Sequence, residues 1–587
     1  MVKKIVLSCF LLIFCMSFAV AMNNGQKIHP VDSDIYSAME TLYMMEGHAL
    51  PSTAGPWSEA ELLDMLQGVT PTSSATQKVY DYIASQLSIE PEIVMGSDGD
   101  VAMTFDINTA FEVYLHTNEV FKDEEYWVHG FNDRAKFLDV GWDVWSTDNI
   151  FIYFDAALLM NSLGNHHNNA EGNYLYQDTF VTNVPLLPPA DFGADGDFTF
   201  PYRSFGSFGS DHWNLSIGRD RFSWGPGESG NFMLGSHFIQ HDYIKFTTFH
   251  NAYKYTLLAS FFPPDSTMGK DQNADFPGFT MFLGHRIEFS FLEDTVGFVL
   301  SEAISYKTDK NTLNLAAINP FGFFHNEYIR GLSNSLVTAE LDINPFGYVD
   351  YYAQFAIDEI ALGETMEPDP GAYPNAMAYM LGAKTAFPIS DAIVAEASFE
   401  AALTDPFLYL RGLDGTSDDS GIAGYSNGYG YDAIVKNFNK PGDYKRMFLG
   451  YEYGGDAVVL NYTSSLTDFG NWSAFLNGMY MWHGNKRLDS PWSPYGKNGL
   501  DELVTILSGD VIERTFILSL GGTYHVSQVP GLYLKAGLDY VNIVNMKSDT
   551  PTIFHATDYG DDVELYLNVE GSNHADIQMS FGIGYSF

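Results

Sequence analysis

Cysteine is almost absent from this chain of 587 residues, which contains two, Cys9 and Cys15. Both lie in an apolar stretch at the N-terminus, residues 1–21, that we expect to be cleaved off. The mature chain would then hold neither a disulfide nor a thiolate metal site. A lipoprotein anchored through Cys15 is the competing interpretation, but Phe14 is a poor fit to the small residue expected before a lipidated cysteine.

The stretch 1–21 has the three parts of a secretory signal peptide. Lys3 and Lys4 give a basic start, and an apolar run follows from Ile5 to Phe18. Ala19-Val20-Ala21 then supplies the small residues that a signal peptidase requires. We therefore predict an exported protein.

Basic residues are also scarce, because 29 Lys and Arg stand against 74 Asp and Glu, a formal net charge of -45. Loss of Lys3 and Lys4 with the leader takes the 29 to 27 against the same 74, a charge of -47. Such a chain is a poor partner for nucleic acid. We expect most of the acids to keep exposed loops soluble. The acidic run Asp414–Asp419 lacks the spacing of a calcium loop, and we predict no metal site and no cofactor.

Long apolar runs are missing after the leader. No stretch reaches the ~18 residues that a membrane-spanning helix needs. Aromatic residues nevertheless make up 15% of the chain, with 36 Tyr and 45 Phe, as expected for the aromatic girdles of a membrane barrel. If the chain crosses a membrane, it must do so as strands.

The C-terminus has the pattern of a barrel strand. From Ile577 to Phe587 apolar residues alternate with small or polar ones. One face would meet lipid and the other the lumen. The terminal Phe587 resembles the C-terminal signature of bacterial outer-membrane β-barrels, which implies recognition by the barrel-assembly machinery.

A different period governs residues 31–87. Apolar residues recur there at three- and four-residue steps, which predicts helices. We place helix starts at Asp32, at Ser58 with Glu61 as its capping partner, and at Ser74 with Gln77 as its partner. This region predicts a small helical periplasmic domain, residues 22–98.

From Val101 onward the period is two. Phe105, Ile107 and Phe111 share one face with their apolar neighbours, and Asp106 and Glu112 lie on the other, so the first barrel strand is expected here beside the last one. Further predicted strand segments are Trp213–Arg219, Ile244–Phe262, Ile287–Tyr306, Tyr348–Ile357, Ala392–Ala402, Met447–Thr463, Trp472–Trp482, Phe516–His525 and Leu532–Asn545.

The predicted fold is therefore an all-β transmembrane antiparallel barrel, residues 99–587, preceded by the helical domain. Strands of ~9–11 residues with alternating turns and loops permit an even strand number of about 16–18, and we favour 18. A barrel of that width either leaves an aqueous lumen or is filled by inward loops.

The segment Gly218–Leu234 combines charged, aromatic and turn-forming residues. It contains Trp224-Gly225-Pro226-Gly227 followed by Asn231 and an apolar triplet. Here the chain resembles the Wzi-like capsule-assembly family of outer-membrane proteins. The resemblance continues through His285-Arg286-Ile287-Glu288, Ser301-Glu302-Ala303 and Asn319-Pro320 to Tyr352, Gln354 and Asp358. It departs after Leu234, where the family tends to have a Ser/Asn-rich stretch and an Arg-Pro step and this chain reads Gly235-Ser236-His237-Phe238.

Pro226 between two glycines predicts a sharp turn, and Arg219 and Arg221, two apart on a strand, would share a side. If that side is the lumen, the guanidiniums could bind acidic sugars and Trp224 could stack on a sugar ring. The candidate glycan-binding residues are Arg219, Arg221, Trp224, Glu228, Asn231 and Arg286. The favoured alternative is that the arginines pair with lumen acids such as Asp220, Glu228 and Glu288 and brace the wall.

The resemblance implies a monomeric, non-enzymatic barrel in the bacterial outer membrane that binds surface polysaccharide and assists capsule or exopolysaccharide assembly or attachment. Its expected partners are outer-membrane lipid and that polysaccharide. The alternative is a porin-like channel for small solutes, in which Asp106 and Glu112 would favour cations. A barrel hydrolase would require a nucleophile and base facing each other at one rim, and the sequence points to no such pair.

Overall fold

The structure is a computed structural model. It describes residues 24–87, 93–95, 101–121, 126–130, 133–146, 149–160, 180–184, 196–199, 202–250, 252–264, 277–308, 310–313, 333–360, 374–411, 430–436, 444–488, 490, 504–555 and 562–587. The predicted signal peptide, the acidic run Asp414–Asp419 and the Asn319-Pro320 step lie outside the described residues.

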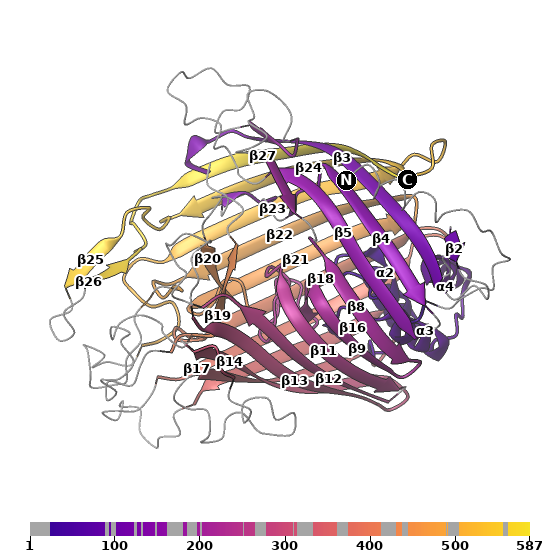
Figure 1. Cartoon of the computed structure of the whole chain (residues 1–587). Coiled ribbons are helices and arrows are strands. Elements are labelled where there is room, and N and C mark those ends of the chain that lie inside the picture. Colours follow the sequence, from indigo (N-terminus) through magenta and orange to yellow (C-terminus); the bar gives the residue numbers. More distant parts are fainter. Residues whose placement is uncertain are drawn as a thin grey trace, which may run out of the picture.

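The chain forms a closed antiparallel barrel of 18 strands, which confirms the predicted fold class (Figure 1). Residues of β27 pair with β3, for example Phe581 with Val113, so the last strand closes the barrel on the first. The barrel strands are β3 (Val101–His116), β4 (Leu138–Ser146), β5 (Ile150–Met160), β8 (Ser204–Ser210), β9 (Trp213–Asp220), β11 (His241–His250), β12 (Tyr253–Phe262), β13 (Phe279–Phe291), β14 (Val296–Thr308), β15 (Ser333–Ile343), β16 (Val349–Glu359), β17 (Ala376–Pro388), β18 (Val394–Thr404), β21 (Ala457–Asp468), β22 (Trp472–His483), β23 (Glu513–His525), β24 (Leu532–Val544) and β27 (His574–Ser586).

The outer face of the barrel is apolar, as a lipid-facing surface must be. Ile217, Leu381 and Phe581 are 61%, 68% and 52% exposed. Their neighbours along each strand, such as Ser216 and Ser580, are buried in the lumen. The period-two pattern of the sequence therefore sorts residues between lipid and lumen as predicted.

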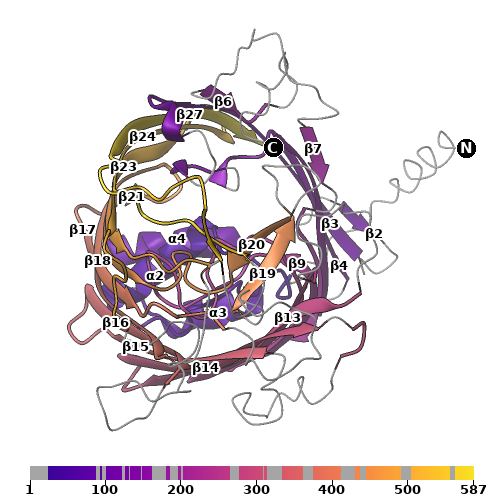
Figure 2. The same ribbon diagram turned by 90° about the vertical axis from the view of Figure 1, so that its left-hand side faces the viewer.

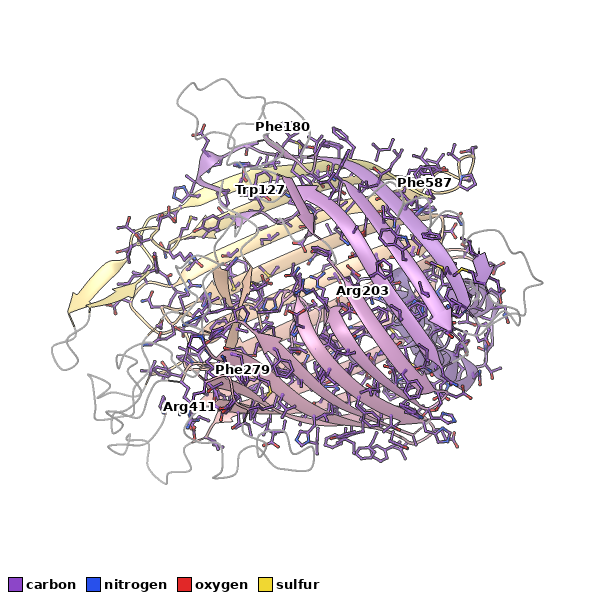
Figure 3. The ribbon with its side chains drawn as sticks, viewed as in Figure 1. Trp127, Phe180, Arg203, Phe279, Arg411 and Phe587 are labelled. Carbon is purple, nitrogen blue, oxygen red and sulfur yellow. The ribbon has the colours of Figure 1, made fainter. Side chains whose placement is uncertain are left out.

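The two ends of the barrel differ. Short turns, such as residues 344–348 between β15 and β16, lie at the end that carries Phe587, whereas longer connections, such as residues 221–240, leave the other end. Figure 3 shows Phe587 at one end and Arg411 at the other. Because barrels of this class have short periplasmic turns and long outer loops, we assign the Phe587 end to the periplasm.

Within the described residues, three helices precede the barrel: α2 (Asp34–Glu46), α3 (Glu59–Gly68) and α4 (Ser74–Leu87). The predicted cap at Ser58 is confirmed, since its hydroxyl accepts from the Glu61 N–H, whereas the Glu61 carboxylate pairs with Lys254. The other two predicted caps were wrong by one residue. Ser33 rather than Asp32 caps α2, and at α4 the Ser73 hydroxyl accepts from the Thr76 N–H. Where several polar residues are adjacent, the backbone conformation determines which of them caps the helix. The residue types alone therefore do not identify the cap.

The helices lie inside the periplasmic end of the barrel. Figure 2 shows them within the ring of strands. Their apolar core includes Ala386, Val394 and Phe469 of the barrel. At the polar contacts, the Ala49 N–H donates to the Asp294 carbonyl (2.6 Å) and the Tyr348 N–H to the Met44 carbonyl (2.9 Å). Among the described residues, no helix is both long and apolar enough to cross a membrane.

Much of the lumen beyond the helices is filled by inward-folded chain. β1 (Ala54–Gly55) pairs there with β10 (Ser223–Trp224). One large apolar cluster joins the barrel wall to its connections, and includes Trp145, Phe151, Phe205, Phe222, Trp224, Phe232, Met233, Leu234, Tyr409, Tyr431 and Tyr451.

The structure also has small elements outside the 18 barrel strands. They are η1 (Glu119–Phe121), β2 (Ile93–Met95), β6 (Phe180–Thr182), β7 (Gly196–Thr199), β19 (Asp432–Lys436), β20 (Tyr444–Phe448), β25 (Thr552–His555) and β26 (Asp562–Leu565).

Candidate functional site

The connection from β9 to β11, residues 221–240, turns into the lumen, and we call it the plug loop. Gly225 has φ 132, a backbone conformation that glycine adopts without strain. Its N–H donates to the Thr53 carbonyl (2.9 Å), so the plug loop and the N-terminal segment hold each other. Trp224 is 1% exposed and packs edge-on against Phe282 at 5.9 Å between ring centroids. In this arrangement Trp224 is a core residue with no face open to a sugar.

Asn231 holds the turn of the plug loop closed. Its side-chain oxygen accepts from the Gly227 N–H (2.9 Å) and from Gln354 Nε2 (2.7 Å), and its Nδ2 donates to Ser223 Oγ (3.1 Å). The apolar triplet that follows, Phe232-Met233-Leu234, is fully buried. The motif seen in the sequence is thus the element that fills the barrel.

Glu228 joins the plug loop to the barrel wall and to the helices. Its carboxylate pairs with Lys384 Nζ (2.7 Å), which also pairs with Glu40 of α2 (2.7 Å). The backbone N–H of Glu228 donates to Glu400 (2.8 Å). A cavity of about 250 Å³ lies beside this group and is lined by Glu228, Asn231 and Lys384. With 29% of its side chain exposed, Glu228 can still meet a ligand.

Arg286 is 1% exposed on β13 and braces the wall. It forms a two-pronged pair with Glu340 (2.5 and 2.9 Å) and a further bond to Glu288 (3.1 Å). Glu288 in turn accepts from the Ser52 hydroxyl (3.0 Å) and the Thr53 N–H (3.1 Å). For Arg286, these contacts match the bracing interpretation of the sequence.

Arg219 and Arg221 do not share a side. Arg219 lies on the outward face of β9 and pairs with the exposed Asp242 (2.8 Å). Because β9 ends at Asp220, strand alternation no longer applies to Arg221, whose Nε donates to the Ser236 carbonyl. Arg221 points into a large cavity and lies 3.8 Å from Asp32. The expectation that both arginines face one ligand was therefore wrong.

That large cavity has a volume of about 750 Å³ and a lining that combines acids, cations and tyrosines. It lies between the N-terminal segment and the wall formed by β3, β4, β5, β23 and β24. Its charged and aromatic lining consists of Asp32, Asp34, Glu112, Asp133, Arg134, Lys136, Asp139, Tyr153, Asp155, Tyr202, Arg203, Asp220, Arg221, Tyr533 and Lys535.

Some cations of the cavity are tightly paired and others are not. Arg203 forms a two-pronged pair with Asp220 (2.7 and 2.8 Å). Lys136 contacts Asp139 (2.8 Å) and lies over the ring of Tyr202 (4.2 Å). Lys535 is 4.0 Å from its nearest carboxylate and 40% exposed. Cations, acids and tyrosine rings together suit a polyhydroxylated ligand, because they offer hydrogen bonds of both senses and stacking faces.

Burial raises the pKa of Asp133 at the cavity edge, against the opposing effect of the Arg221 guanidinium. Sequence reasoning found Arg221 but missed Arg134, Lys136 and Tyr202. They belong to connections without a motif, and barrel closure brings them together. The only sequence signal for this part of the cavity was the pair of cations, Arg134 and Lys136, just before β4.

A search of solved structures found Wzi from Escherichia coli, described as a carbohydrate-binding β-barrel of the outer membrane involved in group 1 capsule assembly. The match covers 95% of this chain and 99% of that chain, with a TM-score of 0.53 and 15% sequence identity. The chain shares the fold of Wzi. This agrees with the resemblance of the Trp224-Gly225-Pro226-Gly227 segment.

Porins match less well. OprD from Pseudomonas aeruginosa is 9% identical over 83% of this chain and 94% of its own, with a TM-score of 0.35. An anion-selective porin from Comamonas acidovorans is 10% identical over 83% of this chain and 100% of its own, with a TM-score of 0.32. A scan against protein-family models found no match, and neither did a search of curated proteins.

Proposed function

We propose that this protein is a monomeric outer-membrane barrel that binds surface polysaccharide and assists capsule or exopolysaccharide assembly or attachment, without making or breaking a bond. The observation that carries the proposal is that the plug loop and the N-terminal segment fill much of the lumen. The plug loop and the N-terminal segment place an apolar core, including Trp224 and Phe232, where a porin keeps water. The fold shared with a carbohydrate-binding barrel supports the same assignment.

Within this function, the large cavity supplies the polar contacts to the glycan. Arg221 and Lys535 would meet carboxylates of an acidic polysaccharide by charge-assisted hydrogen bonds, and the tyrosine rings of the lining offer stacking faces. Glu228 is accessible at the smaller cavity. Trp224, Asn231 and Arg286 act by holding the plug loop and wall in place.

Arg219 stands outside this site. It therefore provides a matched control for Arg221, since both are arginines at the outer end of β9 and each lies near one acid in the described part of the chain, Asp242 for Arg219 and Asp32 for Arg221. The exposed Phe587 at the end of β27 is our proposed contact for the barrel-assembly machinery.

The test is planar-bilayer conductance of the refolded mature protein, with and without the surface polysaccharide of its host. We expect no steady channel steps, retention of the polysaccharide by the wild type, at least tenfold weaker retention by Arg221→Gln, and unchanged retention by Arg219→Gln. Steady cation-selective steps in the wild type would replace the proposal with the porin-like alternative. Equal losses in both variants would remove the cavity from the binding site.

A further inference from the structure

Two turns and a helix bring three metal-ligating side chains together at the periplasmic rim. His212 lies in the turn between β8 and β9, His250 ends β11, and Asp64 is on α3. One ligand atom from each lies within 4.8 Å of the other two. The imidazole rings are 5.0 Å apart between centroids and inclined by 65°. The pairing of β9 with β11 places the two histidines side by side, and the packing of the helices in the barrel mouth brings Asp64 to them.

The backbone under these side chains is fixed. The His212 carbonyl accepts from the Phe249 N–H (3.0 Å) and the Thr248 hydroxyl (3.1 Å), which ties the two turns together. On the helix side, Glu61 forms a buried pair with Lys254 of β12. Lys254 also donates to the Ala54 carbonyl (2.9 Å). The helix that carries Asp64 is therefore anchored to the strand that follows His250.

The side chains of Asp64, His212 and His250 can rotate towards a bound ion. Both imidazoles are exposed and Asp64 is half-buried. Tetrahedral coordination at Zn–N and Zn–O lengths of about 2.0–2.2 Å places ligand atoms about 3.3 Å apart, so rotation of exposed side chains suffices to close the present separation. A cavity of about 160 Å³ adjoins Asp64 and His250 and leaves room for a water ligand.

Although the sequence predicted no metal site, we propose that Asp64, His212 and His250 form a zinc site that ties α3 to two periplasmic turns. Two neutral imidazoles and a carboxylate match the donors that zinc prefers, and three protein ligands leave a fourth position for water. Calcium and magnesium prefer oxygen ligands and fit this set poorly. The site is independent of the glycan-binding cavity, because none of its ligands lines that cavity.

The test uses the full mature protein in detergent, prepared without a histidine tag and stripped with EDTA. Titration with zinc chloride, followed by metal analysis of the washed protein, should give one tightly held zinc per chain. His212→Gln, His250→Gln and Asp64→Asn should each weaken that binding at least tenfold. His525→Gln is the matched control, because His525 is an exposed histidine at another periplasmic turn, and it should bind zinc as the wild type does.

Two further measurements distinguish a specific zinc site from nonspecific binding of zinc to an acidic chain. Zinc should slow amide exchange of α3 in the wild type and in His525→Gln, but not in His250→Gln. Calcium at the same concentration should not slow it. Unchanged zinc binding in the histidine variants, loss of binding in His525→Gln, or an equal effect of calcium would overturn the proposal. Native migration of each variant on unheated gels shows that the barrel has folded.

Discussion

At the scale of single residues, Arg286 should matter more to stability than any surface cation. Its guanidinium compensates the buried carboxylates of Glu288 and Glu340. Replacing it with Met leaves both without that cation, and breaking a buried pair in this way costs about 3–5 kcal/mol. We expect Arg286→Met to lower the free energy of unfolding in urea by that amount. Arg219→Gln removes an exposed pair and should change it by less than about 1 kcal/mol.

A double variant tests why Arg286→Met would lower the stability. If uncompensated charge is responsible, Arg286→Met combined with Glu340→Gln should recover part of the loss, since the two sites are in contact and their effects are not additive. A double variant as unstable as the sum of the singles would point to lost packing instead.

His29 and Glu59 make the stability of the N-terminal segment depend on pH. Burial raises the pKa of Glu59 to about 8, against the effect of Lys27, and burial lowers the pKa of His29. His29 Nε2 and a Glu59 oxygen are 3.4 Å apart. Near neutral pH, a protonated carboxyl can therefore donate to a neutral imidazole, in place of an ion pair.

The signs of the two effects differ. Folded Glu59 keeps a proton that the unfolded chain releases above about pH 4.5, so its contribution to stability falls as pH rises towards 8. His29 is neutral when folded, so its contribution falls as pH drops below about 6.5. Above pH 6.5 only the Glu59 effect remains. Because Glu59 is buried in the folded chain, stability should fall throughout the range from pH 6.5 to about 8.

The measurement is the urea concentration at which limited proteolysis begins to cut residues 24–87, taken from pH 6.5 to 8.5. It should fall with rising pH in the wild type and stay level in Glu59→Gln. An equal fall in both would assign the pH dependence to other groups.

At the scale of elements, the plug loop should be sensitive to a single methyl group. A Cβ on Gly225 would lie 2.3 Å from Asn231 Oδ1, and φ 132 is unfavourable for alanine. Gly225→Ala should displace Asn231, loosen the loop and produce intermittent conductance in a planar bilayer. Gly206→Ala is the control, because nothing lies within 4 Å of the added atom. A silent Gly225→Ala barrel would mean that the loop does not seal the lumen.

The strands show where sequence patterns succeed and fail. Segments such as Trp472–Trp482 and Leu532–Asn545 match β22 and β24 closely, because alternation alone defines a strand with lipid on one side. Two long predicted runs each contain two strands. In the run Ile287–Tyr306 the turn uses Leu292, Glu293 and Asp294 at φ 55, 57 and 61, and none of them is a glycine that would have marked it.

The candidate functional site could be predicted from the sequence only in part. The motif around Trp224 identified a chemically unusual segment, but its role as a buried plug depends on partners such as Thr53 and Gln354. Those contacts join residues far apart in the chain. A local pattern cannot reveal them, whereas barrel closure fixes them.

At the scale of the whole molecule, the helices and the barrel should not fold separately. Helices of 10–14 residues are marginal in water by themselves. Here part of their apolar core comes from Phe469 in the turn between β21 and β22, and Glu61 relies on Lys254 for charge compensation. Residues 22–98 produced alone should therefore have little helical signal in circular dichroism, although the sequence pattern suggests a domain.

The complementary experiment uses a barrel that begins at residue 99. Without the helices and the segment that pairs with β10, the plug loop loses Ala54 and Thr53 as partners. This truncated barrel should conduct ions, and addition of the 22–98 peptide should reduce that conductance as the peptide becomes helical. A stably helical peptide, or a truncated barrel as silent as the full chain, would show that the two parts are independent domains. Mutual dependence instead means that the seal of the lumen forms only once chain closure and helix docking are both complete.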